Sequence, residues 1–503
     1  MNTLQFEQYT ALELGRLIQN REVSSPEVTR AFLQQMEQGA SFGAYLTETA
    51  SLALQQAEAV QARLDAGETL SPLAGVPAAV KDNICTKGVR TTAGSKMLET
   101  FVPPYDAAVM ERFSAAGGVL LGKTNLDEFA MGSTSETSFF GPVRNPWDET
   151  RTPGGSSGGS AAAVSGGMAA WALGSDTGGS VRQPAAFCNL SGIKPTYGAV
   201  SRYGLIAYAS SFDQIGTMGL DILDAAAALD LISQKPLGLE EVYKSESFGS
   251  TANTAMPFTG LRIGLPEDWL HGADAAVKDA ILSAAKAMEA AGAAIVPLHL
   301  PELDAAVPAY YVIACAEASS NLARYDGIRY GYRSPSAETL QDIFVKSRTE
   351  GFGPEVKRRI LLGSFVLSAG HYDAYYKKAL EARRRISAAF DRAFAVCDCI
   401  LAPTSPSVAP KLTSAKDVPG ETASSIAPQD PLALYKADLY TVPANLAGIP
   451  AISVPCGFSA EGLPISLQLM SKAWSEPLLV RTAALWQQLT SYHKKRPQGG
   501  AAK

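Results

Sequence analysis

Histidine is scarce in this sequence, with four residues in a chain of 503. They stand far apart and in unrelated local contexts, at His271, His299, His371 and His493. No pair has the short spacing of histidines that share a metal ion, so the pattern predicts no metal site. A Ser-His-Asp triad is also disfavoured, because it needs a histidine in a distinctive setting.

Cysteine is nearly as rare, and its six residues are scattered along the chain. Only Cys397 and Cys399 are close together, inside the apolar run 394–402. That run is typical of a strand with alternating faces rather than of a metal-binding turn. We therefore expect free, buried thiols in a reducing compartment.

The chain also lacks long runs of one charge and long apolar runs. Its net charge is -6 and no five like charges are adjacent, which excludes a general electrostatic surface for nucleic acid. The longest run of small apolar residues, 161–173, is too short to span a bilayer. The first residues do not resemble a signal peptide, and Glu7 and Glu13 disfavour a transit peptide. We expect a cytoplasmic protein without a membrane partner.

Glycine and serine, in contrast, are concentrated in two turns, 151–160 (RTPGGSSGGS) and 174–184 (GSDTGGSVRQP). Ser156 and Ser180 lie 24 residues apart in these turns, and the small side chains of 161–173 suit a helix packed inside a core. A single glycine turn is often only a close-packed turn. Two such turns that both carry serine favour a site, because glycine lets a substrate approach main-chain amides that can hold an oxyanion.

A lysine supplies the base that such a site needs. The apolar run 74–80 predicts a buried strand, and Lys81 closes it. A lysine at a strand end can extend its ammonium to the surface, but a desolvated lysine loses proton affinity and can act as a base. We predict a relay in which Lys81 takes a proton through Ser156 while Ser180 attacks.

Two motifs match by letter but not by context. Residues 117–124 fit the phosphate-binding pattern GxxxxGK[ST], yet the positions between its glycines are typical of the inside of a strand. Residues 154–158 fit the GxSxG pattern of α/β-hydrolases, yet the polar loop 145–153 precedes them instead of a strand. Both interpretations are disfavoured, and nucleotide binding through Lys123 remains an alternative.

Strand and helix patterns alternate along most of the chain. They predict an α/β fold with one large domain, in which a central twisted sheet, mostly parallel or mixed, is covered by helices on both faces. Helices are expected at 10–20, 26–38, 49–66, 107–116, 274–291, 306–323, 353–368, 370–396 and 474–492. Strands are expected at 74–80, 118–121, 261–265, 294–300, 400–404, 450–455 and 465–469.

The expected domain organisation has three parts. Residues 1–66 form N-terminal helices that pack on the core, 67–493 form the domain, and 494–503 form a disordered tail. Within the domain, the polar segment 233–258 is a surface excursion, and 405–430, rich in Pro, Ser and Ala, is a long loop.

At the two glycine turns the sequence resembles the amidase signature family, through segments 153–164 and 175–187 and the residues around Lys81. The resemblance implies a Ser–cis-Ser–Lys triad, with Ser180 as nucleophile, Ser156 as the bridging serine after a cis peptide bond, and Lys81 as the base. It also implies that main-chain amides hold the oxyanion, those of Thr177, Gly178, Gly179 and Ser180.

Within that family, the chain resembles the glutamine-hydrolysing subunits of tRNA-dependent amidotransferases, through segments 123–133, 197–205, 309–330 and 430–446. The resemblance implies a glutaminase that supplies ammonia to a partner, the B subunit, which amidates Glu-tRNA(Gln) with ATP. ATP, Mg²⁺ and most tRNA contacts are expected on that partner, and a C subunit is expected in the complex. No cofactor or metal is expected in this chain.

Free glutamine needs a cation for its α-carboxylate and an acid for its α-ammonium group. The resemblance assigns Arg359 and Asp438 to these roles, with Tyr310 nearby. The neighbouring Arg358 and Tyr311 remain alternatives.

Two other functions remain open. A free-standing hydrolase of small amides would use the same triad without partners. A non-catalytic scaffold would fit only if Lys81, Ser156 and Ser180 lie far apart.

Overall fold

A single sheet organises the molecule. The structure, a computed structural model, describes residues 5–244, 256–413 and 435–497. Within these ranges, 11 strands form one sheet in the order β1-β3-β2-β4-β6-β5-β10-β11-β9-β7-β8. The strands are β1 (Tyr45–Glu48), β2 (Pro77–Lys81), β3 (Val119–Thr124), β4 (Trp171–Asp176), β5 (Ser191–Lys194), β6 (Gln214–Gly219), β7 (Arg262–Leu265), β8 (Ala294–Pro297), β9 (Cys399–Pro403), β10 (Ala451–Phe458) and β11 (Pro464–Ser471).

The sheet is mixed, which is one of the two forms that the sequence predicted, mostly parallel or mixed. Its parallel pairs are β2 with β3 and β4, and β7 with β8 and β9. Between these groups, β6, β5, β10 and β11 pair antiparallel with their neighbours. The strand β10 continues into β11 through a short reversal, which is a connection that only antiparallel neighbours can make.

Apolar side chains cover both faces of the sheet, as the α/β prediction requires. Along β9, Cys399 and Leu401 belong to one buried cluster, and Ile400 and Ala402 belong to another. Because successive strand residues point to opposite faces, the two clusters lie on opposite sides of the sheet.

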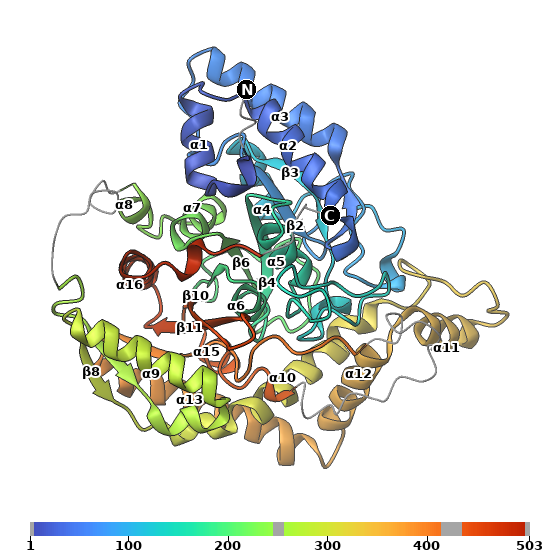
Figure 1. Cartoon of the computed structure of the whole chain (residues 1–503). Coiled ribbons are helices and arrows are strands. Elements are labelled where there is room, and N and C mark those ends of the chain that lie inside the picture. The colour runs from blue at the N-terminus through green and yellow to red at the C-terminus, as the bar shows by residue number, and fades with distance from the viewer. Residues whose placement is uncertain (1–4, 245–255, 414–434, 498–503) are drawn as a thin grey trace.

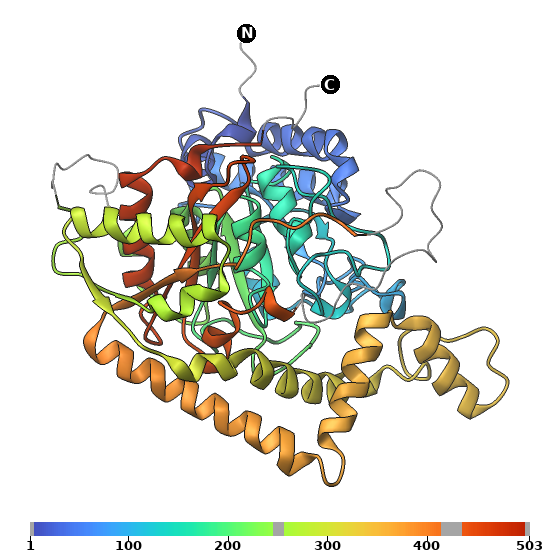
Figure 2. The same ribbon diagram turned by 60° about the horizontal axis from the view of Figure 1, so that its bottom comes forward.

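Helices supply the rest of both clusters. Helices α9 and α16 contribute to the first, and α10 and α13 to the second. Figure 2 shows α10 and α13 side by side under the sheet; α12 packs against α10, and α11 lies farther out from the body. The helices are α1 (Ala11–Gln19), α2 (Ser25–Gln38), α3 (Ala50–Asp65), α4 (Ala108–Ala115), α5 (Gly158–Ser165), α6 (Arg182–Phe187), α7 (Ile222–Ile232), α8 (Glu240–Tyr243), α9 (Ala275–Ala290), α10 (Ala306–Asn321), α11 (Leu340–Gly351), α12 (Pro354–Leu367), α13 (Lys377–Val396), α15 (Val442–Ala447) and α16 (Glu476–Leu489).

The helix caps follow the sequence signals. Thr10 and Glu13 form the predicted reciprocal capping box at the start of α1. Ser24 accepts the Glu27 amide at the start of α2, with Pro26 in its first turn.

The prediction of one buried helix over 161–173 was wrong in its second half. The helix α5 ends at Ser165, and Gly167 turns the chain with a φ of 72°. The strand β4 then begins at Trp171. Small side chains suit a tightly packed helix and a central strand equally, so composition did not reveal this boundary.

The helix predicted over 370–396 begins later. Residues Tyr372–Tyr376 form a π-helical turn, and α13 starts at Lys377. Other predictions fall partly outside the described residues. Of segment 233–258, the described part includes α8, and most of 405–430 and of the tail 494–503 lies in the ranges that the structure does not describe.

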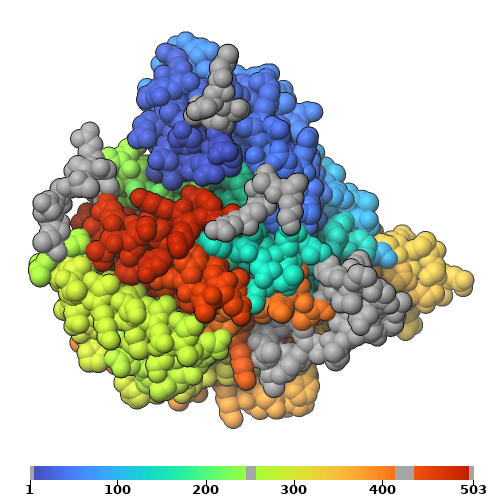
Figure 3. Space-filling model, in the orientation of Figure 1, coloured from blue at the N-terminus to red at the C-terminus, as the bar shows by residue number. Residues whose placement is uncertain are grey.

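The N-terminal residues lie against the later chain. The amides of Ala11 and Leu12 donate to Asp224 at 2.8 and 2.9 Å, and β1 pairs with β3 at the edge of the sheet. Figures 1 and 3 show the N-terminal helices at one end of the molecule, beside segments from the C-terminal part. In the described ranges, no helix is both long and apolar enough to cross a membrane.

Candidate active site

Lys81 lies at the carboxyl end of β2 and is fully buried. Its Nζ atom lies within hydrogen-bond distance of three hydroxyl oxygens, at 2.8 Å from Ser156, 2.8 Å from Ser157 and 2.9 Å from Ser175. The structure thus brings the predicted base into direct contact with the predicted bridging serine.

The electrostatic setting of Lys81 favours a neutral amine. Burial lowers the pKa of Lys81 to about 7, although the charges of Asp127, Asp176 and Asp213 act in the opposite direction. Within the described ranges, no carboxylate lies close enough to form an ion pair with Lys81. A buried amine that titrates near neutral pH can accept a proton in catalysis.

Lys123, the residue of the phosphate-binding pattern, has a different environment. It lies inside β3 with its side chain fully buried, and its Nζ donates to the Ile84 carbonyl at 2.7 Å and to Thr91 at 2.9 Å. Asp82 lies 3.5 Å away as an ion partner. A phosphate-binding lysine must reach into an open loop, so this geometry excludes the nucleotide site.

Ser156 lies in the turn before α5. A cis peptide bond joins Gly155 to Ser156, as the family resemblance implied. The Gly155 amide donates to the Gln183 side chain at 3.0 Å, which links the first glycine turn to α6 after the second turn.

Ser180 lies in the second turn, between β4 and α6, and is 7% exposed. Its carbonyl oxygen accepts the Ser157 amide at 3.2 Å, so the two turns lie against each other. Among the described residues, none hydrogen-bonds the Ser180 hydroxyl. The turn that carries the predicted nucleophile therefore lies against the turn that carries Ser156, and the nucleophile's hydroxyl is bound to no described protein group.

A buried ion pair shapes the second turn. Arg182 and Asp176 are both fully buried and bind each other through two nitrogens, at 3.0 and 2.9 Å. Burial alone would raise the pKa of Asp176, but Arg182 holds it well below the usual range. Asp176 also accepts the Gly179 and Val181 amides at 2.9 and 3.2 Å, so it sets the path of the main chain around Ser180.

The four amides expected at the oxyanion are therefore not equivalent. The Gly179 amide donates to Asp176, whereas the amides of Thr177, Gly178 and Ser180 have no acceptor among the described residues. The Gly178 carbonyl accepts the Thr441 hydroxyl at 2.6 Å, which fixes the orientation of this peptide group.

Arg359 and Asp438, the expected glutamine contacts, are both buried. Arg359 donates from Nε to Glu355 at 2.8 Å and from Nη1 to the Tyr208 hydroxyl at 2.6 Å. Its Nη2 donates to no described residue. Asp438 accepts hydrogen bonds from Ser133 at 2.9 Å and from Tyr311 at 2.6 Å, and burial raises its pKa to about 6.

The neighbouring alternatives differ in position. The side chain of Arg358 is 42% exposed, while that of Arg359 is 4% exposed and lies over the Tyr311 ring. Both Tyr310 and Tyr311 are buried. Tyr310 lies against the second turn, since a Cβ atom at Gly178 would be 2.6 Å from its hydroxyl oxygen. Arg359, Asp438 and the two tyrosines therefore gather near the second turn.

Sequence reasoning did not single out several residues of this site. Ser157 and Ser175 complete the hydroxyl cluster around Lys81, and Asp176 and Arg182 hold the second turn. All four stand inside the two glycine turns, so their position in those segments was the signal that could have identified them.

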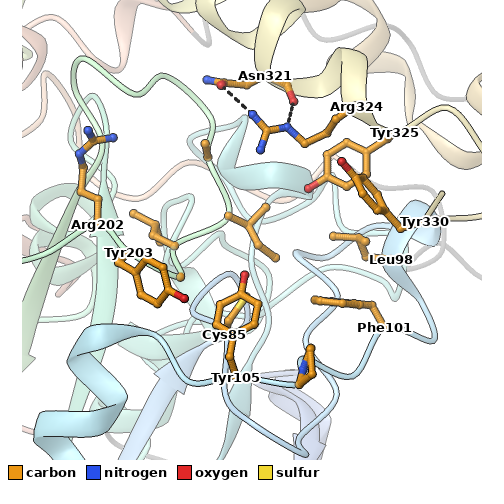
Figure 4. A pocket seen from close by; sticks show the side chains of 15 residues that line it. Cys85, Leu98, Phe101, Tyr105, Arg202, Tyr203, Asn321, Arg324, Tyr325 and Tyr330 are labelled. Atoms are coloured by element: carbon orange, nitrogen blue, oxygen red, sulfur yellow. Dashed lines mark hydrogen bonds between the residues drawn. The ribbon is translucent and has the colours of Figure 1, made fainter.

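A separate cavity of about 610 Å³ lies near this cluster (Figure 4). Its walls include Cys85, Tyr105, Tyr203, Ile206 and Arg324. Its lining residues do not include the three triad positions. A main-chain hydrogen bond joins the cavity wall to the strand end that carries Lys81, since the Ile206 amide donates to the Asn83 carbonyl at 2.8 Å.

The family model of the amidases matches residues 27–480, which include every element of the site. The chain belongs to the amidase family. This assignment agrees with the hydroxyl cluster around a buried lysine.

The amidase is also similar to individual known proteins. It is 50% identical to the A subunit of glutamyl-tRNA(Gln) amidotransferase from Moorella thermoacetica over 496 residues, which cover 98% of this chain and 99% of that protein. A crystal structure of the A subunit of glutamyl-tRNA(Gln) amidotransferase from Thermotoga maritima matches with a TM-score of 0.73 and 36% identity, and covers 96% of this chain and 94% of that one.

The fold of this amidase is shared more widely. The structure of a peptide amidase from Stenotrophomonas maltophilia matches with a TM-score of 0.77 at 30% identity, and covers 98% of this chain and 99% of that one. The fold alone therefore does not separate amidases that work on different amides.

Proposed function

We propose that this amidase is the A subunit of a glutamyl-tRNA(Gln) amidotransferase, the subunit that hydrolyses glutamine. The identity of 50% over almost the whole length of such a subunit carries the proposal. The chemistry agrees with it, because the buried Lys81, which has no carboxylate partner among the described residues, contacts Ser156, the bridging serine of the proposed relay.

The first half-reaction forms an ester. Ser180 Oγ attacks the side-chain amide carbon of glutamine, while its proton passes to Ser156 and the Ser156 proton passes to Lys81 Nζ. The carbonyl electrons move onto the oxygen, which the free amides near Ser180 stabilise. When the C–N bond breaks, the relay returns a proton to the nitrogen and ammonia leaves.

The second half-reaction uses the same groups in reverse. Water attacks the glutamyl ester, and its proton passes through Ser156 to Lys81. The returning proton goes to Ser180 Oγ, which leaves the carbon as glutamate is released. The relay begins and ends with a neutral lysine, as its burial favours.

The glutamine backbone is held by the second group of residues. In this proposal Arg359 binds the α-carboxylate through its free Nη2, and the ionised form of Asp438 binds the α-ammonium group. Tyr310, between this group and Gly178, lines the path of the side chain toward Ser180. Arg359 is preferred over Arg358 because it is the buried one of the two.

The released ammonia is used by partner subunits. In the proposed complex, the B subunit binds ATP, Mg²⁺ and most of the tRNA, the C subunit completes the assembly, and this chain itself needs no cofactor. Within the described ranges, no group of three or more His, Cys, Asp or Glu side chains is arranged to hold a metal. The complex acts in the cytoplasm, where Glu-tRNA(Gln) is available.

The nucleophile can be tested directly. We expect a reactive glutamine analogue to leave a covalent adduct on Ser180, detected by peptide mass spectrometry, and Ser180→Ala to lose both the adduct and glutamine hydrolysis. Ser165→Ala, a change of a buried serine outside the triad, serves as the matched control. An adduct on another residue would contradict the assignment.

Because other amidases share this fold, one alternative function remains, a free-standing hydrolase of small amides. Glutamine hydrolysis that rises strongly when the B and C subunits are added supports the amidotransferase. Full activity of the isolated chain on simple amides supports the alternative.

A further inference from the structure

Asn83 lies two residues after Lys81 and is 2% exposed. Its side-chain nitrogen donates to Ser175 Oγ at 2.9 Å, and the same oxygen lies 2.9 Å from Lys81 Nζ. One hydroxyl group therefore connects Asn83 to the base of the relay.

The hydrogen bonds around Ser175 favour an uncharged lysine. An amide nitrogen and an ammonium group can only donate, so both would direct N–H groups at Ser175 Oγ. The Ser175 proton would then have no acceptor among the described groups. A neutral amine has one lone pair, which can accept this proton in the resting site and the Ser156 proton during the reaction, so the donor side of the Asn83 amide matches the resting free base.

The other end of the same amide has no partner. Asn83 Oδ1 is buried, and no described residue donates a hydrogen bond to it. A buried carbonyl oxygen without a donor lowers stability and calls for a functional explanation. The contact with Ser175 is the hydrogen bond that sets which end of the amide faces the base.

Burial favours the free base of Lys81, but nearby carboxylates oppose it. Three carboxylates raise the proton affinity of the amine: Asp127 just before Glu128, Asp176 at the end of β4, and Asp213 just before β6. Arg182 offsets Asp176, and Lys123 on β3 offsets Asp82. The positive end of the Asn83 amide dipole lies close to the base. Like these cations, it lowers the proton affinity of Lys81, but without adding a net charge.

We propose that Asn83, acting through Ser175, is a positioning residue that holds Lys81 as the free base. The inference rests on the proposed function for its assay, and it concerns a side chain that makes no hydrogen bond to Ser180 in the described structure. A carboxylate at this position would do the opposite, because it would stabilise the ammonium form.

The test compares Asn83→Leu and Asn83→Asp with the wild type in the complete complex. The readout is kcat/KM for glutamine hydrolysis as a function of pH, measured by ammonia release. We expect the midpoint of the rising limb to move to higher pH, by less than one unit for Leu and by about one to three units for Asp. At pH values above the new midpoint, the rate returns toward that of the wild type.

A purely structural role would lower the rate at every pH without moving the midpoint, and that result would overturn the proposal. Asn189→Asp is the matched control. Asn189 is also 2% exposed, but its amide donates to the carbonyls of Tyr492 and Lys495, away from the triad. We expect the pH midpoint of Asn189→Asp to stay at the wild-type value.

The outcomes separate this inference from the proposed function. If the wild-type complex does not hydrolyse glutamine, the proposed function is wrong. If it does and the three midpoints coincide, only the role of Asn83 is wrong. If Asn83→Asp does not fold, as judged by circular dichroism, an unmoved midpoint in Asn83→Leu is enough to overturn it.

Discussion

Two buried lysines on neighbouring strands show how the surroundings of a residue decide its chemistry. Lys123 has Asp82 at 3.5 Å, and its Nζ donates to the Ile84 carbonyl and to Thr91, so its side chain has a structural role. Lys81, on the adjacent strand, is surrounded by hydroxyl groups and has no described carboxylate in contact. Burial lowers the pKa of both lysines, but Asp82 opposes this shift at Lys123, whereas Lys81 has no described carboxylate in contact and its pKa falls to about 7.

The pH dependence of the reaction follows from this difference. Because the neutral amine is the active form, we expect kcat/KM for glutamine hydrolysis to rise with pH through a midpoint of about 7. Lys81→Ala should lose activity by roughly a thousandfold or more at all pH values. A rising limb centred well above pH 9 would show that Lys81 stays charged.

The same shift makes a prediction about stability. The pKa of Lys81 is near 7 in the folded chain and near 10.5 when the chain is unfolded. Between these values the unfolded state binds more protons, so the free energy of unfolding increases as pH rises through this window. Lys81→Met should flatten that rise, as measured by urea unfolding at several pH values between 7 and 10.

The choice between the two adjacent arginines can be tested by exchange for lysine. Arg359→Lys should raise KM for glutamine about tenfold to a hundredfold, because a lysine loses the planar donor set that binds a carboxylate. Arg358→Lys is the control, since its half-exposed side chain should leave KM within about twofold. Steady-state kinetics of both variants decides the assignment, and equal effects would contradict it.

At the scale of elements, the unit that matters is β4, the turn after it and α6. The turn would have no preferred shape from its glycines alone. Asp176 at the end of β4 binds two amides of the turn and Arg182 at the start of α6, so one carboxylate sets the direction of three segments. Ser180, the proposed nucleophile, lies in the turn that this network holds.

Breaking the network should unfold the turn rather than only slow the reaction. Arg182→Met leaves Asp176 as a buried charge without its partner, and we expect a loss of about 3–5 kcal/mol in the free energy of unfolding. Arg262→Met breaks the more exposed ion pair with Asp398 and should cost no more than about 1 kcal/mol. Chemical denaturation of both variants measures the difference. Similar losses would mean that the buried pair does not support the turn.

At the scale of the whole molecule, the first 66 residues and the rest of the chain share one sheet. Thr47 in β1 pairs with Lys123 in β3, and Asp224 caps α1 from the later chain. We propose that residues 1–66 pack on a domain of 67–493 and fold with it as one unit. Residues 494–503 are proposed as a tail, although Lys495 still accepts a hydrogen bond from Asn189.

This proposal predicts a single unfolding transition. All five tryptophans lie at position 147 or later, so their fluorescence reports the main domain. Hydrogen exchange of the amides in α1–α3 reports the N-terminal part. We expect both signals to change at the same denaturant concentration. Exchange in α1–α3 at a lower denaturant concentration than the fluorescence change would show that the N-terminal helices unfold independently.

Sequence by itself predicted much of the strand–helix alternation, the caps of α1 and α2, and the closeness of Lys81 and Ser156, while Ser180 stays its predicted nucleophile. These are local signals: a periodicity, a short spacing or a pair of glycine turns. It did not place the boundary between α5 and β4, because small residues suit both elements.

Only the tertiary structure decided the rest. Which strands run antiparallel depends on pairings between distant segments, such as β5 with β10. That Lys81 has no carboxylate partner among the described residues, that Asp176 occupies the Gly179 amide, and that Asn83 faces the hydroxyl cluster are contacts between side chains from different elements. Their energies depend on distance and burial in three dimensions, which no local pattern in a chain records.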